Sequence, residues 1–362
     1  MGVNRLKITN ECAQVFFKNY DYTNEEIYHI ESDSYVIYSF GNQIIALHKT
    51  GCIQRVILDE VPDAANYLRN RRMITDGDTA YYVYDDMIII EDLESGNKKQ
   101  VSLKKEGDEE ARPCCDLWLY NEHYLIYRTA FCMYHMIDLN IGIESEEDLE
   151  IMADTCGVYL RGDYLYFLAY GLEDDDVYKE YYKLMRYGLK NHENTDVTKH
   201  FAVHNDSTGI RAMYAIAKEG VAGNVFYCIF EYQDISSDSR RGFDCFCMDM
   251  SPNSMSEVKR FYIRTPRAYQ IEQYNGKLIY INGDKDYSLI VHDIVRDKAS
   301  VIARGCGTKQ KSIMLNRGIV GAVMDRLMID REPAPEPESY ARVGKWIRIR
   351  RRQNWAPEIV EI

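Results

Sequence analysis

The amino-acid sequence predicts an all-β fold, a single seven-bladed β-propeller of four-stranded antiparallel blades whose ring is closed by a terminal strand. A hairpin-like unit recurs along the chain. Residues 35–47 and 80–92 each consist of a β-branched and aromatic run, a two-residue turn and a second run. The turns, Gly41-Asn42 and Asp85-Asp86, lie about 44 positions apart. A repeat of roughly 40 to 50 residues built from such runs is typical of propeller blades.

Length and composition agree with this prediction. Seven blades of roughly 45 residues would occupy most of the 362 residues, so we expect one domain over residues 1–362. The chain is 46% hydrophobic and 28% charged, which is ordinary for a globular protein with a sizeable core. Its 30 tyrosines suit half-buried strands, where the ring packs and the hydroxyl reaches the edge.

Seven units follow one another along the sequence. Their second strands are expected to begin near Tyr35, Thr79, His123, Asp163, Asn224, Lys277 and Gly318. Several third strands end on Asp followed by an aliphatic residue, as at Asp92-Leu93, Asp138-Leu139, Asp249-Met250 and Asp293-Ile294. An Asp in this place is suited to accept backbone N–H bonds from the turn that follows.

The two ends of the chain suggest how the ring closes. Residues 12–18 read as a strand ahead of the first unit, and this N-terminal strand is expected to complete the last blade. The last unit would use residues 311–316, 318–330 and 342–350, and residues 358–362 compete for the closing position. Either choice would remove open sheet edges.

The pattern resembles WD-repeat and related seven-bladed propellers over nearly the whole chain. The Gly-His and Trp-Asp dipeptides of WD repeats are absent, and Asp-Leu stands where Trp-Asp would be, as at Asp92-Leu93. The resemblance therefore implies a diverged, WD-repeat-like propeller and no specific family.

The net charge and the cysteines indicate which partners and which cellular compartment to expect. A net charge of −13 argues against nucleic acid or an anionic membrane as the main partner. The first 20 residues contain no secretory signal, and no run of 18 apolar residues could span a bilayer. The ten cysteines are scattered without disulfide spacings, which favours a reduced compartment, the cytoplasm or the nucleus, and we predict a cytoplasmic location.

Extra length collects on one face of the predicted propeller, the face that carries the loops between second and third strands and the connections between blades. We call it the loop-rich face; its long segments are residues 61–72, 104–113, 170–178, 232–242 and 332–339. Loops on a rigid scaffold commonly carry binding. We therefore predict binding residues in the fourth and fifth units at Tyr170, Asp174, Asp175, Asp176, Tyr178, Arg240 and Arg241. The acidity favours a basic protein or peptide partner; the alternative is that acidic loops keep an exposed surface soluble.

Local motifs for chemistry are weak. Cys245 and Cys247 share one face of a strand, and His200, His204 and Asp196 resemble half a metal site, but neither group has enough further ligands. No metal and no cofactor are predicted. No nucleophile elbow, phosphate-binding glycine loop or His-Glu-x-x-His helix is present.

These observations favour a non-enzymatic scaffold that binds a protein or peptide across the loop-rich face. The alternative is a propeller enzyme or small-ligand binder with a site in the central channel, because such sites are assembled from distant residues and leave no local motif. A third hypothesis is a subunit of a larger assembly that pairs with another chain through Trp355, Pro357 and residues 359–362.

Overall fold

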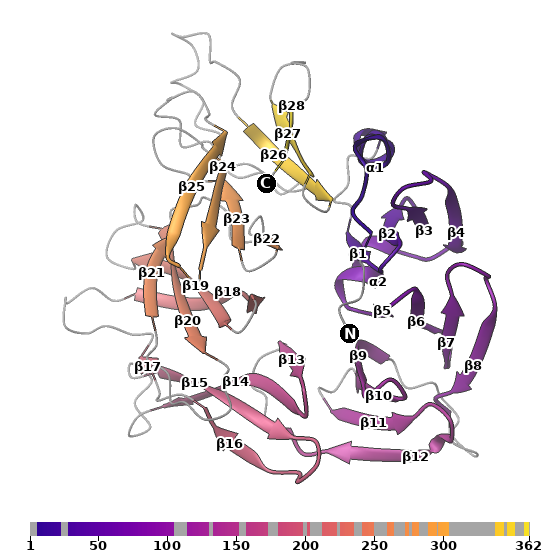
Figure 1. Ribbon diagram of the computed structural model, residues 1–362. Helices are drawn as coiled ribbons and strands as arrows, with labels where there is room; N and C mark the ends of the chain where they lie inside the picture. Colours follow the sequence, from indigo (N-terminus) through magenta and orange to yellow (C-terminus); the bar gives the residue numbers. More distant parts are fainter. Residues whose placement is uncertain are drawn as a thin grey trace. The chain divides into compact units, whose positions relative to one another are not determined.

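The chain has an all-β propeller fold of four-stranded antiparallel blades, and the strands of each blade are labelled in Figure 1. The computed structural model describes residues 6–22, 28–104, 114–129, 133–151, 157–172, 180–197, 201–202, 212–222, 225–234, 241–249, 259–263, 272–274, 277–281, 289–294, 296–303, 337–343, 346–351 and 358–361. It divides into two compact units, residues 1–151 with 341–347 and residues 152–340 with 348–362. The prediction of one domain over residues 1–362 stays a prediction.

The first unit contains three four-stranded blades, each a simple meander. The first blade is β1 (His29–Glu31), β2 (Tyr35–Phe40), β3 (Gln43–His48) and β4 (Gln54–Leu58). The second is β5 (Met73–Asp76), β6 (Thr79–Tyr84), β7 (Met87–Asp92) and β8 (Lys98–Ser102). The third is β9 (Cys114–Tyr120), β10 (Tyr124–Thr129), β11 (Tyr134–Asp138) and β12 (Gly142–Leu149).

The second unit contains three further blades. The fourth blade is β13 (Val158–Arg161), β14 (Tyr164–Leu172), β15 (Glu180–Gly188) and β16 (Asn194–Asp196), with β17 (Phe201–Ala202) also paired to β15. The fifth is β18 (Ala212–Ala222), β19 (Val225–Asp234), β20 (Arg241–Asp249) and β21 (Lys259–Ile263). The sixth is β22 (Glu272–Tyr274), β23 (Lys277–Ile281), β24 (Leu289–Asp293) and β25 (Lys298–Ala303).

The predicted number of blades is wrong. The described residues form six four-stranded blades, not seven, and the last sheet has three strands: β26 (Pro337–Val343), β27 (Trp346–Arg351) and β28 (Glu358–Glu361). Residues 311–330, which were expected to supply two strands of a seventh blade, lie outside the described residues. Closure of the ring stays a prediction.

The predicted blade periodicity is confirmed. β2, β6 and β23 begin at the predicted residues, and β10, β14 and β19 begin one residue later; Gly318 lies outside the described residues. Most residues of β2 and β3 are buried on both faces, with only the strand ends partly exposed. A strand covered by neighbours on both faces reads as a continuous apolar run, which explains why the runs were legible in the sequence.

The third-strand endings serve as turn anchors, as predicted. Asp92 accepts a hydrogen bond from the backbone N–H of Ser95 (2.6 Å), and Asp138 accepts one from Asn140 (2.8 Å). The aliphatic residue that follows has a second role. The backbone N–H of Leu93 donates to the carbonyl of Asp78 (2.9 Å), just before the second strand of the same blade, and Leu93 is buried.

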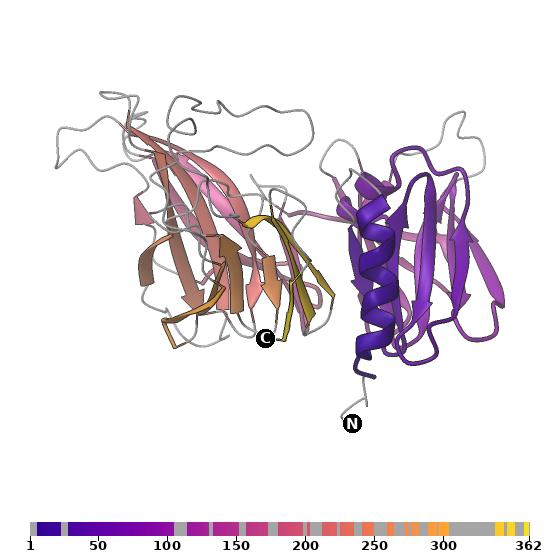
Figure 2. The ribbon, with the colours of Figure 1, turned by 90° about the horizontal axis from the view of Figure 1, so that it is seen from above.

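Residues 12–18 form no strand, so that prediction is wrong. They lie within the helix α1 (Asn10–Tyr22), which runs beside the first blade (Figure 2). The buried side chains recur at helical spacing, at Cys12, Ala13, Phe16 and Phe17. Phe16 packs edge-on against Tyr38 of β2, with ring centroids 5.2 Å apart. The terminal strand in the last sheet is β28, which pairs with β27.

A disulfide joins Cys12 of α1 to Cys52 in the turn after β3. The expectation of wholly reduced cysteines is therefore wrong for this pair, while Cys114 and Cys247 are buried thiols. Sequence reasoning missed the pair because its partners are 40 residues apart and one lies on a helix that was read as a strand. No helix among the described residues is long and apolar enough to span a membrane. The cytoplasmic location stays a prediction.

The cores lie between successive blades. The first and second blades share a core with α2 (Ala64–Arg69); its members are Ile37, Ile44, Ala46, Ile57, Leu58, Val61, Ala64, Tyr67, Leu68, Met73, Ala80, Tyr82, Ile89 and Leu93. The second and third blades share another, made of Tyr81, Val83, Ile88, Val101, Leu103, Cys114, Leu117, Leu125, Tyr127, Ile137, Leu139 and Ile143. Burial between blades is the main source of stability in such a repeat fold.

Candidate functional site

A cluster of titratable side chains lies on the third blade, on its last three strands. Tyr127 of β10 is directly opposite His135 of β11, and His135 is directly opposite Asp148 of β12. Because side chains alternate along a strand, Glu146 lies on the same face of β12 as Asp148. Antiparallel pairing therefore brings a phenol, an imidazole and two carboxylates together on one side of the sheet. We call His135, Glu146 and Asp148 the His-Glu-Asp cluster.

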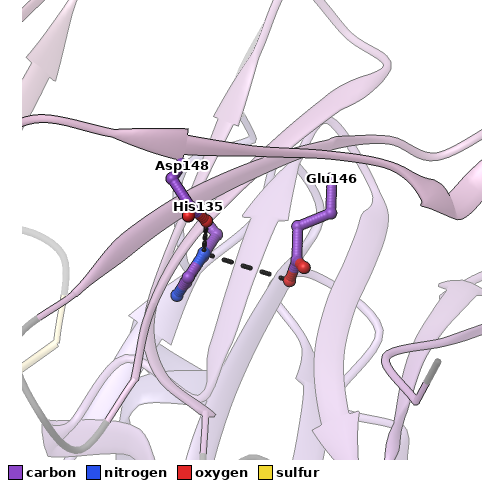
Figure 3. A group of neighbouring side chains, drawn as sticks. All are labelled: His135, Glu146 and Asp148. Carbon is purple, nitrogen blue, oxygen red and sulfur yellow. Dashed lines mark hydrogen bonds and ion pairs between the residues drawn. The ribbon is translucent and has the colours of Figure 1, made fainter. Parts of the chain in front are cut away.

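The donor atoms of the cluster converge on one nitrogen (Figure 3). Nδ1 of His135 lies 2.7 Å from Oδ1 of Asp148, a hydrogen-bond distance, and 4.0 Å from Oε1 of Glu146. One ligand atom from each of the three residues lies within 4.8 Å of the other two. The sequence was searched for imidazole and carboxylate groups that could bind a metal together. Among the described residues, the His-Glu-Asp cluster is such a group.

Burial differs sharply within the cluster. The side chains of His135 and Glu146 are only 4% and 2% exposed, whereas that of Asp148 is 73% exposed. The Tyr127 ring stacks on the imidazole, with centroids 5.2 Å apart, and its hydroxyl donates a hydrogen bond to Glu146. Tyr127 itself is fully buried in the core between the second and third blades. The cluster therefore has a fixed inner side and a solvent-accessible outer side.

The second blade has a related arrangement with a different outcome. Tyr82 occupies the same place in β6 as Tyr127 in β10, and its hydroxyl donates to Glu91, which is 1% exposed (2.7 Å). Here two cations complete the site, because Arg55 and Lys98 lie 3.0 Å and 3.2 Å from the Glu91 carboxylate. Burial, reinforced by the hydrogen bond to Glu91 and its charge, raises the pKa of Tyr82 far above its ordinary value. This is a closed ion-pair network.

Asp78 ties the second blade to the first. Its carboxylate accepts hydrogen bonds from the hydroxyls of Ser32 and Ser34 (2.8 Å and 2.6 Å) and from the backbone N–H of Ser34 (2.7 Å). Burial alone would raise the pKa of Asp78, but these bonds, helped by the charge of Lys49, lower it below its usual value. The carboxylate is therefore held ionised between two blades.

The residues predicted to bind a partner are largely untested. Asp174, Asp175, Asp176, Tyr178 and Arg240 lie outside the described residues. Tyr170 pairs with Tyr182 near the end of β14, and Arg241 begins β20, opposite Gln233. Nothing is described of the side chains of Tyr170 and Arg241.

The weak metal candidates from the sequence are not assembled by the described residues. His200 and His204 lie outside them, and Asp196 forms an ion pair with Lys183 (3.0 Å). Cys247 is buried in β20. Burial raises the pKa of the Cys114 thiol well above its usual range, so Cys114 is an unreactive core residue.

One predicted loop of the loop-rich face is a folded element. Residues 64–69 form the helix α2, whose N-cap Asp63 accepts a hydrogen bond from the backbone N–H of Asn66 (3.2 Å). Tyr67 is buried, and its hydroxyl donates to the carbonyl of Val83. Residues 61–72 therefore contribute to the core between the first two blades, and the predicted binding surface is left to the other long loops.

The His-Glu-Asp cluster was missed because it has no compact motif. His135 and Glu146 are 11 positions apart and belong to different strands. One signal was available: the acidic residues Glu144, Glu146, Glu147 and Asp148 lie close together between apolar Ile143 and Leu149. Aligning the strand that contains them with its neighbour would have placed His135 opposite Asp148.

No family model and no curated protein matches this chain. Among solved structures, the tricorn protease is similar with a TM-score of 0.46 and 7% identity, over 91% of this chain and 34% of that chain. The N-terminal domain of Nup159 gives 0.44 and 11% identity, over 90% and 86% of the two chains. A chain of the mitotic checkpoint complex gives 0.42 and 11% identity, over 91% and 82%. The chain thus spans about a third of the tricorn protease chain. Likenesses this distant carry no argument about function, and no family is identified.

Proposed function

We propose that this chain is a non-enzymatic propeller scaffold that binds a basic protein or peptide segment across its loop-rich face, through the loops of the fourth and fifth blades. The observation that carries the proposal is the length of the hairpins beneath those loops. β14 and β15 have nine residues each, and β18, β19 and β20 have 11, 10 and nine. The second and third strands of the first two blades, β2, β3, β6 and β7, have six residues each. Their first strands, β1 and β5, which correspond to β18, have three and four.

The extra length lies at the loop end of each hairpin. β14 starts at the usual place for a second strand and stays paired with β15 as far as Leu172 and Glu180. Three additional residues at about 3.4 Å each extend a strand by roughly 10 Å. A paired extension supports the base of a loop at regular geometry, as expected where a scaffold presents a binding loop.

The chemistry of the presented segment supports a basic partner. Asp174, Asp175 and Asp176 are consecutive in the loop that β14 and β15 support, and the whole chain carries a net charge of −13. Acidic loops on an acidic protein attract cationic segments over distances of about one Debye length, roughly 8 Å at physiological salt. Binding of this kind is expected to weaken as salt rises.

A peptide-display selection followed by binding measurements tests the proposal. The intact chain selects from a random peptide library, and the recovered peptides are measured against the triple variant D174S/D175S/D176S. We expect enrichment of Lys- and Arg-containing peptides that bind the triple variant at least about tenfold more weakly, with an unchanged melting temperature. A matched control, E11S/E94S/E144S, removes three exposed carboxylates elsewhere and should bind normally. Equal binding by both variants would remove this loop from the site.

The alternative function, an enzyme or small-ligand binder with a site in the central channel, stays a prediction that the described residues do not test.

A further inference from the structure

The geometry points to a divalent transition-metal site on the third blade, formed by Nδ1 of His135 and the carboxylates of Glu146 and Asp148. Zn²⁺ is the ion that we propose. The inference does not depend on the proposed partner binding, because the cluster lies in the first unit and the binding loops of the fourth and fifth blades lie in the second.

The spacing of the donors fits one ion. Zinc binds imidazole nitrogen and carboxylate oxygen at about 2.0–2.2 Å, so two ligands of a tetrahedral ion lie roughly 3.4 Å apart. The distances from Nδ1 of His135 to Asp148 and to Glu146, 2.7 Å and 4.0 Å, bracket that value. Each of these two distances differs from that value by less than about 1 Å, and we expect the exposed Asp148 to be the residue that moves when an ion binds.

The donor types select the class of ion. A mixed set of one imidazole and two carboxylates suits Zn²⁺ and its first-row neighbours, whereas Ca²⁺ and Mg²⁺ prefer oxygen ligands alone. Three protein ligands leave a fourth tetrahedral position open. The fourth ligand of the ion would be a water molecule or a group from another molecule, on the side where Asp148 is exposed to solvent.

The surroundings hold two of the three ligands in place. Tyr127 stacks on the His135 ring and donates its hydroxyl to Glu146, so one residue orients both buried ligands. Such outer groups fix the orientation of metal ligands and tune their affinity. Asp148, with its exposed side chain, supplies the entry path.

Charge also favours a cation at this point. Two carboxylates approach the same imidazole nitrogen, and one of them, Glu146, is almost completely buried. A divalent ion would neutralise both carboxylates, and because a ligating nitrogen carries no proton, the imidazole would bind as the tautomer with its proton on Nε2. The rival explanation is an imidazolium paired with two carboxylates; the two differ in whether Zn²⁺ is taken up.

The chain contains a matched control. His292 and Asp297 on the sixth blade form a pair of the same kind, with Nε2 and Oδ1 2.9 Å apart, a buried imidazole and an exposed carboxylate. This pair belongs to no described three-ligand group. If any His–Asp pair sufficed for zinc uptake, His292→Gln would lower it as much as a change in the cluster does.

Isothermal titration of the chelator-treated full chain with ZnCl₂ tests the inference. The variants are Glu146→Gln, Asp148→Asn and His292→Gln, each checked by circular dichroism for native folding. We expect one zinc per chain in the wild type and in His292→Gln, with affinity at least about 100-fold lower in Glu146→Gln and Asp148→Asn. Asp148→Asn keeps the test valid if Glu146→Gln fails to fold, since Asp148 is exposed. Absence of zinc binding in the wild type, or unchanged binding in Asp148→Asn, would overturn the site.

Discussion

The second and third blades build the same buried pair and complete it differently. In both, the fourth residue of the second strand is a fully buried tyrosine whose hydroxyl donates to a glutamate with a buried side chain, Tyr82 to Glu91 and Tyr127 to Glu146. Arg55 and Lys98 then neutralise Glu91, whereas Glu146 faces His135 and Asp148.

The comparison separates a structural role from a ligand-binding one. A carboxylate between two cations and a hydroxyl is part of a closed network, in which the loss of one partner destabilises the blade. A carboxylate that shares an imidazole with a second, exposed carboxylate has the donors of a cation site. The second and third blades therefore share a buried tyrosine–glutamate pair, and the side chains around the glutamate determine whether the pair is structural or could bind a cation.

The largest expected effect is a loss of stability on removing the charge of Glu91. Glu91→Gln breaks a buried ion-pair network and should lower the free energy of unfolding by about 3 kcal/mol. This value is at the lower end of the range measured for broken buried ion pairs, because the side chains of Arg55 and Lys98 retain contact with water. Glu146→Gln, without metal, should stay within about 1 kcal/mol of the wild type, since it removes one of two converging negative charges. Urea denaturation measures both, and equal losses would contradict the comparison.

The shared tyrosine should behave alike in the two blades. Tyr82→Phe and Tyr127→Phe each remove a hydrogen bond to a buried carboxylate and are expected to cost about 1.5–3 kcal/mol. Only Tyr127→Phe should also weaken zinc binding, by about tenfold, because it releases an outer contact of the metal ligands. Denaturation and zinc titration of the same two proteins check this, and a zinc effect in Tyr82→Phe would show that the metal lies elsewhere.

A smaller effect concerns acid stability at the junction of the first two blades. The pKa of Asp78 is lowered in the folded state, so its contribution is present at neutral pH and is lost as pH falls below about 4. Asp78→Asn should be less stable than the wild type at pH 7, and the two should converge toward pH 2. Thermal unfolding across this range tests it, with the exposed Asp76→Asn as control. A constant difference at all pH values would assign the loss to packing.

The smallest expected effect is that of Asp148→Asn without metal. The Asp148 carboxylate is exposed, and an interaction with an exposed carboxylate typically contributes less than about 1 kcal/mol, so the melting temperature should barely change. A loss as large as that of Glu91→Gln would mean that the third blade, too, holds a closed structural network. Differential scanning calorimetry in the presence of a chelator decides between the two.

The blades could be predicted from sequence because a strand between two neighbours is a continuous apolar run of fixed spacing. The helix α1 was missed because Cys12, Phe16 and Phe17 are apolar residues of types that also occur in buried strands, and their helical spacing was overlooked. The His-Glu-Asp cluster depends on the pairing register of β11 with β12, which no single segment encodes. The binding loops stay predictions, because most of their residues lie outside the described chain.

The most direct test of the contrast between the two blades is anomalous diffraction from crystals of the chain soaked in ZnCl₂, with data collected on both sides of the zinc edge. We expect a peak about 2.0–2.2 Å from Nδ1 of His135 and from one oxygen each of Glu146 and Asp148, and none beside Glu91. A zinc-soaked crystal without density between these three residues, or with zinc beside Glu91, would contradict it.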